Sequence, residues 1–430
     1  MDATGTPLLL SRRFAPLFWC QFCAAFNDNF LKTALVFLIL FRGHSNAEAL
    51  ITAASAIFIA PYFFLSGVGG ELADRYDKAR VAQVIKFVEM LVAALAVWGY
   101  ARESLPILFT ALFAFGVLAS LFGPMKYGIL PDHLPRERLP AGNALIEGAT
   151  FVAILLGTIL GGVAAYRGGA FGFAPMVIGM SIACWLAALF IPPSGEGAPQ
   201  LTVRFNIAAS TLAMLRHLHG DARLWWGALV TSWFWVVGIL VLSLLPPLIR
   251  TLIGGDQATV TIYLALFTVA IGIGSALAAL LSRGRIVLGI TVAGAVLIGV
   301  FAIDLGIATW GVASATTPQA PHAAFSATLG LRVAIDLCGM AVAGGLFIVP
   351  AFAAVQAWSG ADYRARTIAG VNVLNAGFMT VTTVLVALLQ KQGVTLPSLF
   401  VGLGIATLLV AAAVWKTQPK SASSCESDRK

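Results

Sequence analysis

The chain has 430 residues, of which 59% are hydrophobic and only 11% are charged. No soluble core needs so much apolar sequence, so the composition excludes a soluble protein and indicates an all-α integral membrane protein. The short alternating segments of a β-barrel do not appear. The net charge of +8 does not indicate nucleic-acid binding, because the basic residues are spread over short loops.

Apolar segments long enough to cross a bilayer as helices occur twelve times along the chain. A long polar break, which starts at Pro192 and becomes amphipathic before Asp221, divides them into six and six. We therefore predict an N-terminal six-helix bundle in residues 1–191, a cytoplasmic linker in 192–222, a C-terminal six-helix bundle in 223–416 and a polar cytoplasmic tail in 417–430. The predicted spans are 14–41, 49–70, 81–101, 105–130, 142–166, 171–191, 223–252, 258–281, 286–310, 328–355, 367–390 and 396–416.

The first span carries ionisable groups deep inside its apolar run. Asp28 lies about 21 Å along the predicted helix, and Lys32 follows one turn later on the same face. Charges at such depth are costly and usually face a cavity or a partner. Two interpretations remain open. The pair either neutralises itself and orients the helix, or forms a substrate site together with the neighbouring amide of Asn27.

The loop between the second and third spans contains five residues that we expect to act in gating: Gly70, Asp74, Arg75, Lys78 and Arg80. It resembles the cytoplasmic loop signature of the major facilitator superfamily, G-x-L-a-D-r-x-G-r-r, but has Asp77 where that family usually has glycine. Glycine allows close helix approach, and Asp74 can cap a neighbouring helix or pair with an arginine. Such contacts would close one face of a transporter, whereas the alternative is a loop that only sets topology.

Two further charges lie close to the turn between the fourth and fifth spans. Lys126 lies about 7–8 Å from the end of one span, and Glu147 lies at a similar depth in the next. The antiparallel spans can bring them together as a structural ion pair or as a clamp for a substrate headgroup. Asn143, one turn before Glu147, belongs to the same candidate site.

In the second half, Asp304 lies near the outer end of span nine, and Arg332 and Asp336 lie one turn apart near the outer end of span ten. We expect either a gate that closes the outer face or a static structural network. In span seven, Trp233 and Trp235 are deep enough to line a path for an acyl chain.

Orientation and internal repetition support one architecture. With the N-terminus inside, eighteen lysines and arginines fall in cytoplasmic loops and tails and five in outer loops, so both termini are expected in the cytoplasm. Residues 141–147 and 369–375 open spans five and eleven with similar sequences, offset by 228 residues. Parallel repeats of six spans predict the major facilitator fold, with two six-helix bundles.

The motifs F-N-D-N-F-L-K, G-E-L-A-D-R-Y-D-K, G-P-x-K-Y-G-I-L-P-D and L-P-A-G-N-A-L-I-E-G-A-T-F together resemble the bacterial lysophospholipid transporter family. The resemblance covers nearly the whole chain and is strongest in its first half. It implies movement of lysophosphatidylethanolamine and lysophosphatidylglycerol from the outer to the inner leaflet of the bacterial inner membrane, where they are re-acylated.

The resemblance implies membrane lipids and a cytoplasmic acyltransferase/acyl carrier protein synthetase as partners, and no cofactor, metal, catalytic residue or nucleic acid. No acyltransferase H-x-x-x-x-D motif is present. Two other functions remain open: an exporter of drugs or small metabolites with the same fold, and a non-transporting membrane partner of an acyltransferase.

Overall fold

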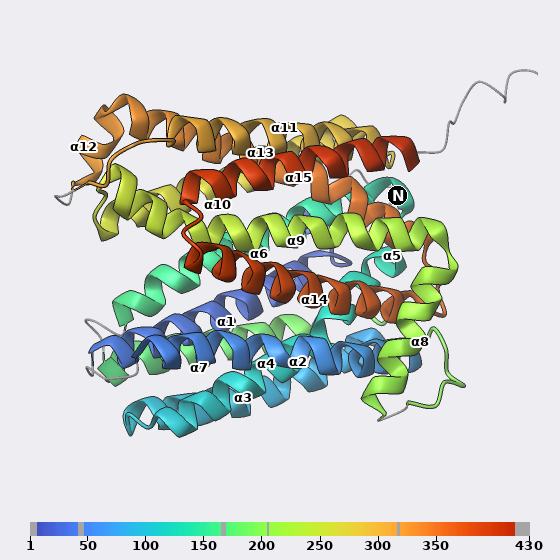
Figure 1. The fold of residues 1–430 in the computed structure, drawn as a ribbon. Coiled ribbons are helices and arrows are strands. Elements are labelled where there is room, and N and C mark those ends of the chain that lie inside the picture. The colour runs from blue at the N-terminus through green and yellow to red at the C-terminus, as the bar shows by residue number, and fades with distance from the viewer. Residues whose placement is uncertain (1–6, 42–46, 165–168, 204–205, 316–318, 418–430) are drawn as a thin grey trace, which may run out of the picture.

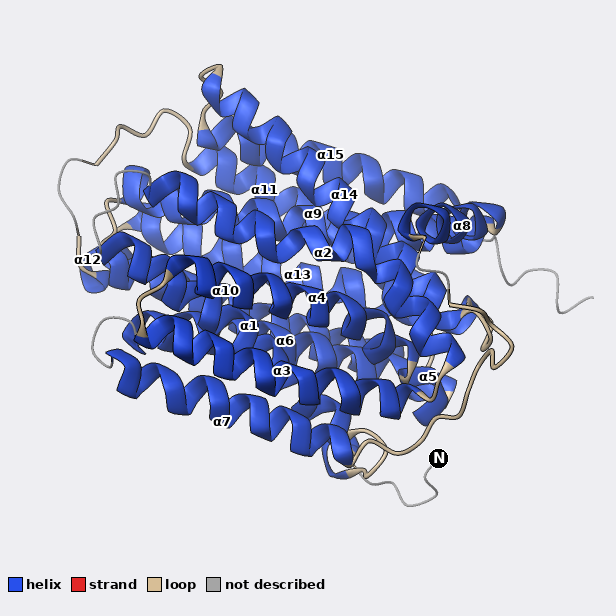
Figure 2. Ribbon diagram, turned by 90° about the horizontal axis from the view of Figure 1, so that it is seen from below, coloured by secondary structure: helices blue, strands red, loops and turns tan. Residues whose placement is uncertain are grey.

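The computed structural model describes residues 7–41, 47–164, 169–203, 206–315 and 319–417. These residues form helices and loops, with no strand among them (Figure 2). Twelve helices in this part of the chain are long and apolar enough to cross a membrane, which confirms the predicted number. The expected tail at 417–430 lies almost entirely outside the described residues.

The N-terminal bundle contains α1 (Ala15–Phe41), α2 (Ala47–Arg75), α3 (Lys78–Ala101), α4 (Leu105–Gly128), the short α5 (Leu130–His133), α6 (Leu139–Val163) and α7 (Gly169–Leu189). The C-terminal bundle contains α9 (Ala222–Leu248), α10 (Gln257–Ser282), α11 (Leu288–Ala308), α12 (Pro321–Ser326), α13 (Thr328–Trp358), α14 (Arg364–Lys391) and α15 (Leu396–Thr417). Figure 1 shows the blue-to-green half and the yellow-to-red half packed alongside each other, with their long helices roughly parallel.

Two further helices lie between the membrane-spanning helices. The Ser/Thr/Pro-rich segment at 311–327 contains α12, which begins at Pro321, a residue suited to the first turn of a helix. The amphipathic half of the linker forms α8 (Ile207–Gly220), capped by the Asn206 side chain. In Figure 1, α8 lies across one end of both bundles. Its Met214 and Leu218 are buried and face Gly67 of α2 and Gly370 of α14.

Glycines permit the closest helix contacts inside each bundle. A Cβ atom on Gly157 or Gly161 of α6 would collide with backbone carbonyl oxygens of α1. On α13, Gly345 approaches the backbone of α10 in the same way. Because small residues let membrane helices approach closely, these positions set the helix spacing around the two bundle interiors.

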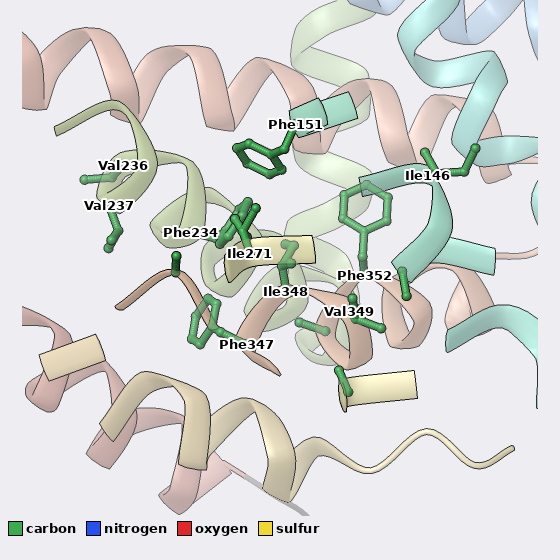
Figure 3. Packing of buried hydrophobic residues seen from close by; sticks show 14 of the residues in the cluster. Ile146, Phe151, Phe234, Val236, Val237, Ile271, Phe347, Ile348, Val349 and Phe352 are labelled. Carbon is green, nitrogen blue, oxygen red and sulfur yellow. The ribbon is translucent and has the colours of Figure 1, made fainter. Parts of the chain in front are cut away.

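Between the bundles, α14 packs against α2 and α4, and α6 packs against α10 and α13. The polar contacts between them gather at one end, which we call the basic end: it carries Arg75, Lys78, Arg364 and Arg366 and is covered by α8. The end that carries α12 is the opposite end. Further inside, apolar side chains fill the seam. Figure 3 shows Phe151 of α6 near Phe234 of α9, and Ile146 of α6 near Phe352 of α13.

Candidate functional site

The candidate site begins with Asp28 and Lys32 on α1. Both side chains are half-buried, although the residues around them on α1 are mostly buried. They lie one helical turn apart on the same face, and Asp28 is within electrostatic reach of Lys86, Glu89 and Lys126. The acid therefore belongs to a cluster of opposite charges drawn from three helices, not to an isolated pair.

Lys86 and Glu89 of α3 form a buried ion pair that our sequence reasoning missed. Both residues are almost completely buried, and the Lys86 ammonium also lies 4.1 Å from the centroid of the Phe122 ring. Oε1 of Glu89 has no hydrogen-bond partner among the described residues. The sequence could have revealed this site, because two charged residues inside an apolar span mark a functional or structural site.

Lys126 and Glu147 are brought together through Tyr127. The tyrosine hydroxyl donates a 2.6 Å hydrogen bond to Oε1 of Glu147, and the Lys126 ammonium lies 4.7 Å from the tyrosine ring centroid. No direct ion pair joins these two described residues. Glu147 is buried whereas Lys126 is half-buried, so the lysine is the member of this group that remains accessible.

Asn27 points away from Asp28. It is fully buried, and its amide nitrogen donates hydrogen bonds to the carbonyl oxygen of Val177 (3.1 Å) and to Oγ of Ser181 (2.7 Å), both on α7. Consecutive residues on a helix are about 100° apart, so Asn27 cannot face the same space as Asp28. In this conformation Asn27 joins two helices.

Asn143 lies in the seam between the bundles. It exchanges two hydrogen bonds with Gln356 of α13, at 2.6 and 3.1 Å, and Nε2 of Gln356 also donates to the carbonyl oxygen of Tyr127. Asn143 and Gln356 are both fully buried. The amide that we expected at the substrate site is therefore engaged, in this conformation, in holding α6 against α13.

The expected gating loop forms the main contact at the basic end. Asp74 is fully buried and accepts hydrogen bonds from the backbone N–H groups of Ala365 (2.9 Å) and Arg366 (3.1 Å) and from Nε of Arg366 (2.9 Å). It thus caps α14 and pairs with an arginine, the two interactions considered from the sequence. A Cβ atom on Gly70 would lie 2.7 Å from Cβ of Ala369, so only glycine allows this approach.

The remaining loop residues have different partners. Lys78 is buried and lies 3.0 Å from Asp132, which also pairs with Arg364 of α14. Arg75 donates to the carbonyl oxygen of Leu201 in the linker, whereas Arg80 is exposed.

Asp77, where the related signature has glycine, caps α3 through the N–H groups of Ala79 and Arg80. Its second oxygen accepts from the N–H groups of Ser194 and Gly195 in the linker. Its φ of −56° needs no glycine, so the turn forms normally with an acid in place.

Asp304 and Arg332 form an exposed ion pair at the opposite end. Asp336 is buried beside them, and its Oδ2 has no partner among the described residues. Because α11 and α13 belong to the same bundle, the pair does not cross the seam in this structure. It joins helices within the C-terminal bundle, and its expected role as a gate is untested.

The C-terminal bundle presents neutral polar groups. Ser232 of α9 donates a 2.8 Å hydrogen bond to Oδ1 of Asn375 on α14, and Nε1 of Trp233 donates to Oγ1 of Thr407. Trp233 and Trp235, expected to line a path for an acyl chain, are both half-buried. Among the described residues, no group of three or more His, Cys, Asp or Glu side chains could hold a metal ion.

Comparisons with known proteins agree with this arrangement. The sequence model of the Major Facilitator Superfamily matches residues 17–333. The lysophospholipid transporter LplT of Enterobacter sp. (strain 638) is 29% identical over 405 residues, which cover 92% of this chain and 93% of the relative. The same transporter of Cronobacter sakazakii is 30% identical over 63% of this chain and 66% of its own length. These relatives confirm the resemblance expected from the motifs.

Solved structures show the same fold at low sequence identity. The human organic anion transporter MFSD10 superposes with a TM-score of 0.72 at 15% identity and covers 93% of this chain and 99% of its own. A bacterial homologue of the iron transporter ferroportin, in an outward-facing state, gives a TM-score of 0.68 at 17% identity over 95% of this chain and 99% of its own.

Proposed function

Because the chain belongs to the Major Facilitator Superfamily and is a multi-pass membrane transporter, we propose that it moves lysophospholipids between the leaflets of the bacterial inner membrane. The direction we propose is from the outer to the inner leaflet, with lysophosphatidylethanolamine and lysophosphatidylglycerol as substrates. The names of its relatives support the substrate class, and the charged interior described above supports a headgroup site.

The observation that carries this proposal is the accessible pair of opposite charges on α1. The half-buried carboxylate of Asp28 suits an ammonium group, and the half-buried ammonium groups of Lys32 and Lys126 suit a phosphate. A zwitterionic headgroup would meet both signs of charge, and an anionic one would meet the two lysines. The hydrogen bonds of Asn27, Asn143 and Glu147 would hold the surrounding side chains and helices in place around these charged groups.

The acyl chain would lie on apolar walls or in the lipid between spans. The basic end would be cytoplasmic, which places the closed seam of Asp74, Asn143 and Gln356 on the inner side. The structure then corresponds to the conformation that loads from the outer leaflet, and opening of this seam would release the lipid inside, as in alternating access. Re-acylation there by a cytoplasmic acyltransferase would draw the lipid inwards without a coupling ion.

The direct test is flipping of labelled lysophosphatidylethanolamine by the purified protein in proteoliposomes, with the diacyl lipid as control. We expect the lysolipid to change leaflets and the diacyl lipid to remain. A non-transporting scaffold would leave lysolipid orientation unchanged, and an exporter of other molecules would move its own substrates but not lysolipid.

The proposed orientation has a separate test, labelling of Cys425 in intact spheroplasts. This residue belongs to the tail expected in the cytoplasm, so an impermeant thiol reagent should not reach it. Labelling from outside would reverse the assignment of the basic end.

A further inference from the structure

The helix α8 and the linker before it lie against both bundles at the basic end. α8 packs against α2 of the N-terminal bundle and against α9 and α14 of the C-terminal bundle. Figure 1 shows it crossing the ends of these helices. In the linker, a Cβ atom on Gly197 would lie 2.8 Å from the carbonyl oxygen of Ala361, before α14, and 3.5 Å from that of Asp74. The segment that joins the bundles therefore contacts both of them where they meet.

Two buried side chains of α8, one helical turn apart, fit against glycines of the two bundles. Met214 faces Gly67 of α2, whose added Cβ would lie 3.5 Å from the methionine sulfur. Leu218 fills the space beside Gly370 of α14, where an added Cβ would lie only 2.6 Å from Cδ1 of the leucine. Both side chains are at most 1% exposed. Because residues four apart share a helix face, α8 contacts α2 and α14 with the same face.

The two glycines that receive α8 lie beside a close contact between the bundles. Gly67 is about one turn before Gly70 on α2, and Gly370 directly follows Ala369 on α14. A Cβ atom on Gly70 would lie 2.7 Å from Cβ of Ala369, so the two helices touch here. α8 thus lies across the junction between α2 and α14. Since a helix does not stretch, separation of α2 from α14 must break one of its two contacts.

Polar contacts fasten α8 and the linker to the N-terminal bundle. The hydroxyl of Ser210 on α8 donates a 2.6 Å hydrogen bond to Glu71 of α2, and both residues are buried. In the linker, the N–H groups of Ser194 (2.9 Å) and Gly195 (2.7 Å) donate to the carboxylate of Asp77. Hydrogen bonds to a charged group are stronger than those between neutral groups. The segment is therefore held on the N-terminal side at two separate points.

The contacts of α8 with α14 are apolar and aromatic. Besides Leu218 against Gly370, the imidazole ring of His217 stacks on the Tyr363 ring that precedes α14, with 3.8 Å between their centroids. The separation of such contacts leaves no buried hydrogen-bonding group without a partner, so it costs less than the separation of polar ones. Asp221, the one residue between α8 and α9, has an extended backbone at which the chain can bend.

We propose that α8 is a latch on the junction between α2 and α14. While the basic end is closed, α8 holds both helices; when this end opens, α8 leaves α14 and stays on α2. The proposal rests on the alternating access proposed above, but not on which molecule is transported. It gives the linker between the bundles a part in the conformational equilibrium, because a contact made only in the closed state stabilises that state.

The first test measures how often the closed end opens in the purified full chain. In a background without native cysteines, Gly128→Cys places a thiol beside Ala365 inside the closed seam, and its alkylation rate reports the open fraction. Leu218→Ala removes the side chain that contacts α14. It should speed alkylation at least about tenfold, since truncation of a buried leucine costs more than the about 1.4 kcal/mol that corresponds to tenfold. The matched control is Leu212→Ala on the exposed face of α8, which should leave the rate unchanged.

Two reversible crosslinks test which side of the latch releases. A Cβ atom on Gly370 would lie 3.6 Å from Cβ of Met214, which suits a disulfide between Gly370→Cys and Met214→Cys. A Cβ atom on Gly67 would lie 3.5 Å from Oγ1 of Thr211, so Gly67→Cys with Thr211→Cys can join α8 to α2 instead. We expect the bond to α14 to lower lysolipid flipping at least about tenfold, and the bond to α2 to change it by less than about twofold. The reduced form of each variant is its own control.

Equal alkylation rates in Leu218→Ala and Leu212→Ala would refute the latch, and so would normal flipping while α8 is bonded to α14. Loss of flipping while α8 is bonded to α2 would show that the latch does not release in the way proposed. If the reduced proteins do not flip lysolipid at all, the proposed substrate is wrong, and the alkylation rates still decide whether α8 is a latch. The two proposals can therefore fail separately.

Discussion

The interiors of the two bundles differ in chemistry although their folds repeat each other. The N-terminal bundle places six charged side chains inside its spans, namely Asp28, Lys32, Lys86, Glu89, Lys126 and Glu147. The C-terminal bundle has a smaller charged cluster inside its spans, Asp304, Arg332 and Asp336 toward the opposite end. It also offers neutral hydroxyl and amide groups, such as the Ser232–Asn375 pair. Under the proposed function, recognition of a charged headgroup would fall to the N-terminal half, and the C-terminal half would supply a more apolar wall.

The largest effect should come from breaking the buried ion pair of the N-terminal bundle. Lys86→Met leaves Glu89 as an uncompensated buried charge, which costs about 3–5 kcal/mol of stability. The double variant Lys86→Met with Glu89→Leu removes both charges and should recover most of that loss. Thermal unfolding of the purified variants in detergent measures both. If the double variant is as unstable as the single one, the pair has a role beyond mutual compensation.

The next effect concerns the pair on α1 and separates its two interpretations. If Asp28 and Lys32 only neutralise each other, the double change Asp28→Asn with Lys32→Gln should transport normally. We expect it instead to lower lysolipid flipping about ten- to a hundredfold, because charge-assisted contacts to the headgroup contribute about 1.5–3 kcal/mol.

The matched control for the α1 pair is Ser232→Ala with Asn375→Leu, which removes a neutral buried pair from the other bundle. Replacing both partners of a hydrogen bond by apolar groups is often nearly neutral, so flipping should change by less than about threefold. Recovery of transport in the α1 double variant, at matched expression and thermal stability, would return Asp28 to a structural role.

A smaller effect is expected at the seam between the bundles. Asp74→Asn keeps one acceptor oxygen but removes the charge that caps α14 and pairs with Arg366, so the closed basic end should lose about 1–2 kcal/mol. We expect a several-fold change in transport rate with little change in lysolipid affinity.

The opening itself can be followed with a cysteine at Gly128, whose added Cβ would lie 3.4 Å from Cβ of Ala365 inside the closed seam. In a background without native cysteines, Asp74→Asn should speed its alkylation. A large loss of affinity with an unchanged labelling rate would contradict a gating role.

The smallest effect is expected at the opposite end of the C-terminal bundle. Arg332 and Asp304 are both more than 40% exposed, and exposed pairs contribute about 0–1 kcal/mol. Arg332→Gln should therefore leave the thermal stability close to that of wild type and change the rate of lysolipid flipping by less than about twofold. A strong transport defect would instead revive the interpretation of this cluster as a gate.

Sequence reasoning predicted the twelve helices, because their apolar length identifies them directly. It also indicated the possible interactions of Asp74, since a loop signature fixes local spacing. It could not predict which way Asn27 points, because the rotation of α1 depends on its packing against α6 and α7. The Asn143–Gln356 pair joins residues 213 positions apart, and no local pattern relates them.

The linker is bound to the transporter at several points, and this has a practical consequence for anyone who wishes to label the protein. The Asp77 carboxylate accepts hydrogen bonds from the N–H groups of Ser194 and Gly195. The carbonyl oxygen of Asp74 accepts one from the N–H group of Ala198, and the hydroxyl of Ser210 on α8 donates one to Glu71. A flexible tether between two halves would be the natural place to insert a fluorescent protein or to divide the gene. Here an insertion near Gly195 would instead break the hydrogen bonds through which the linker holds the gating loop in place.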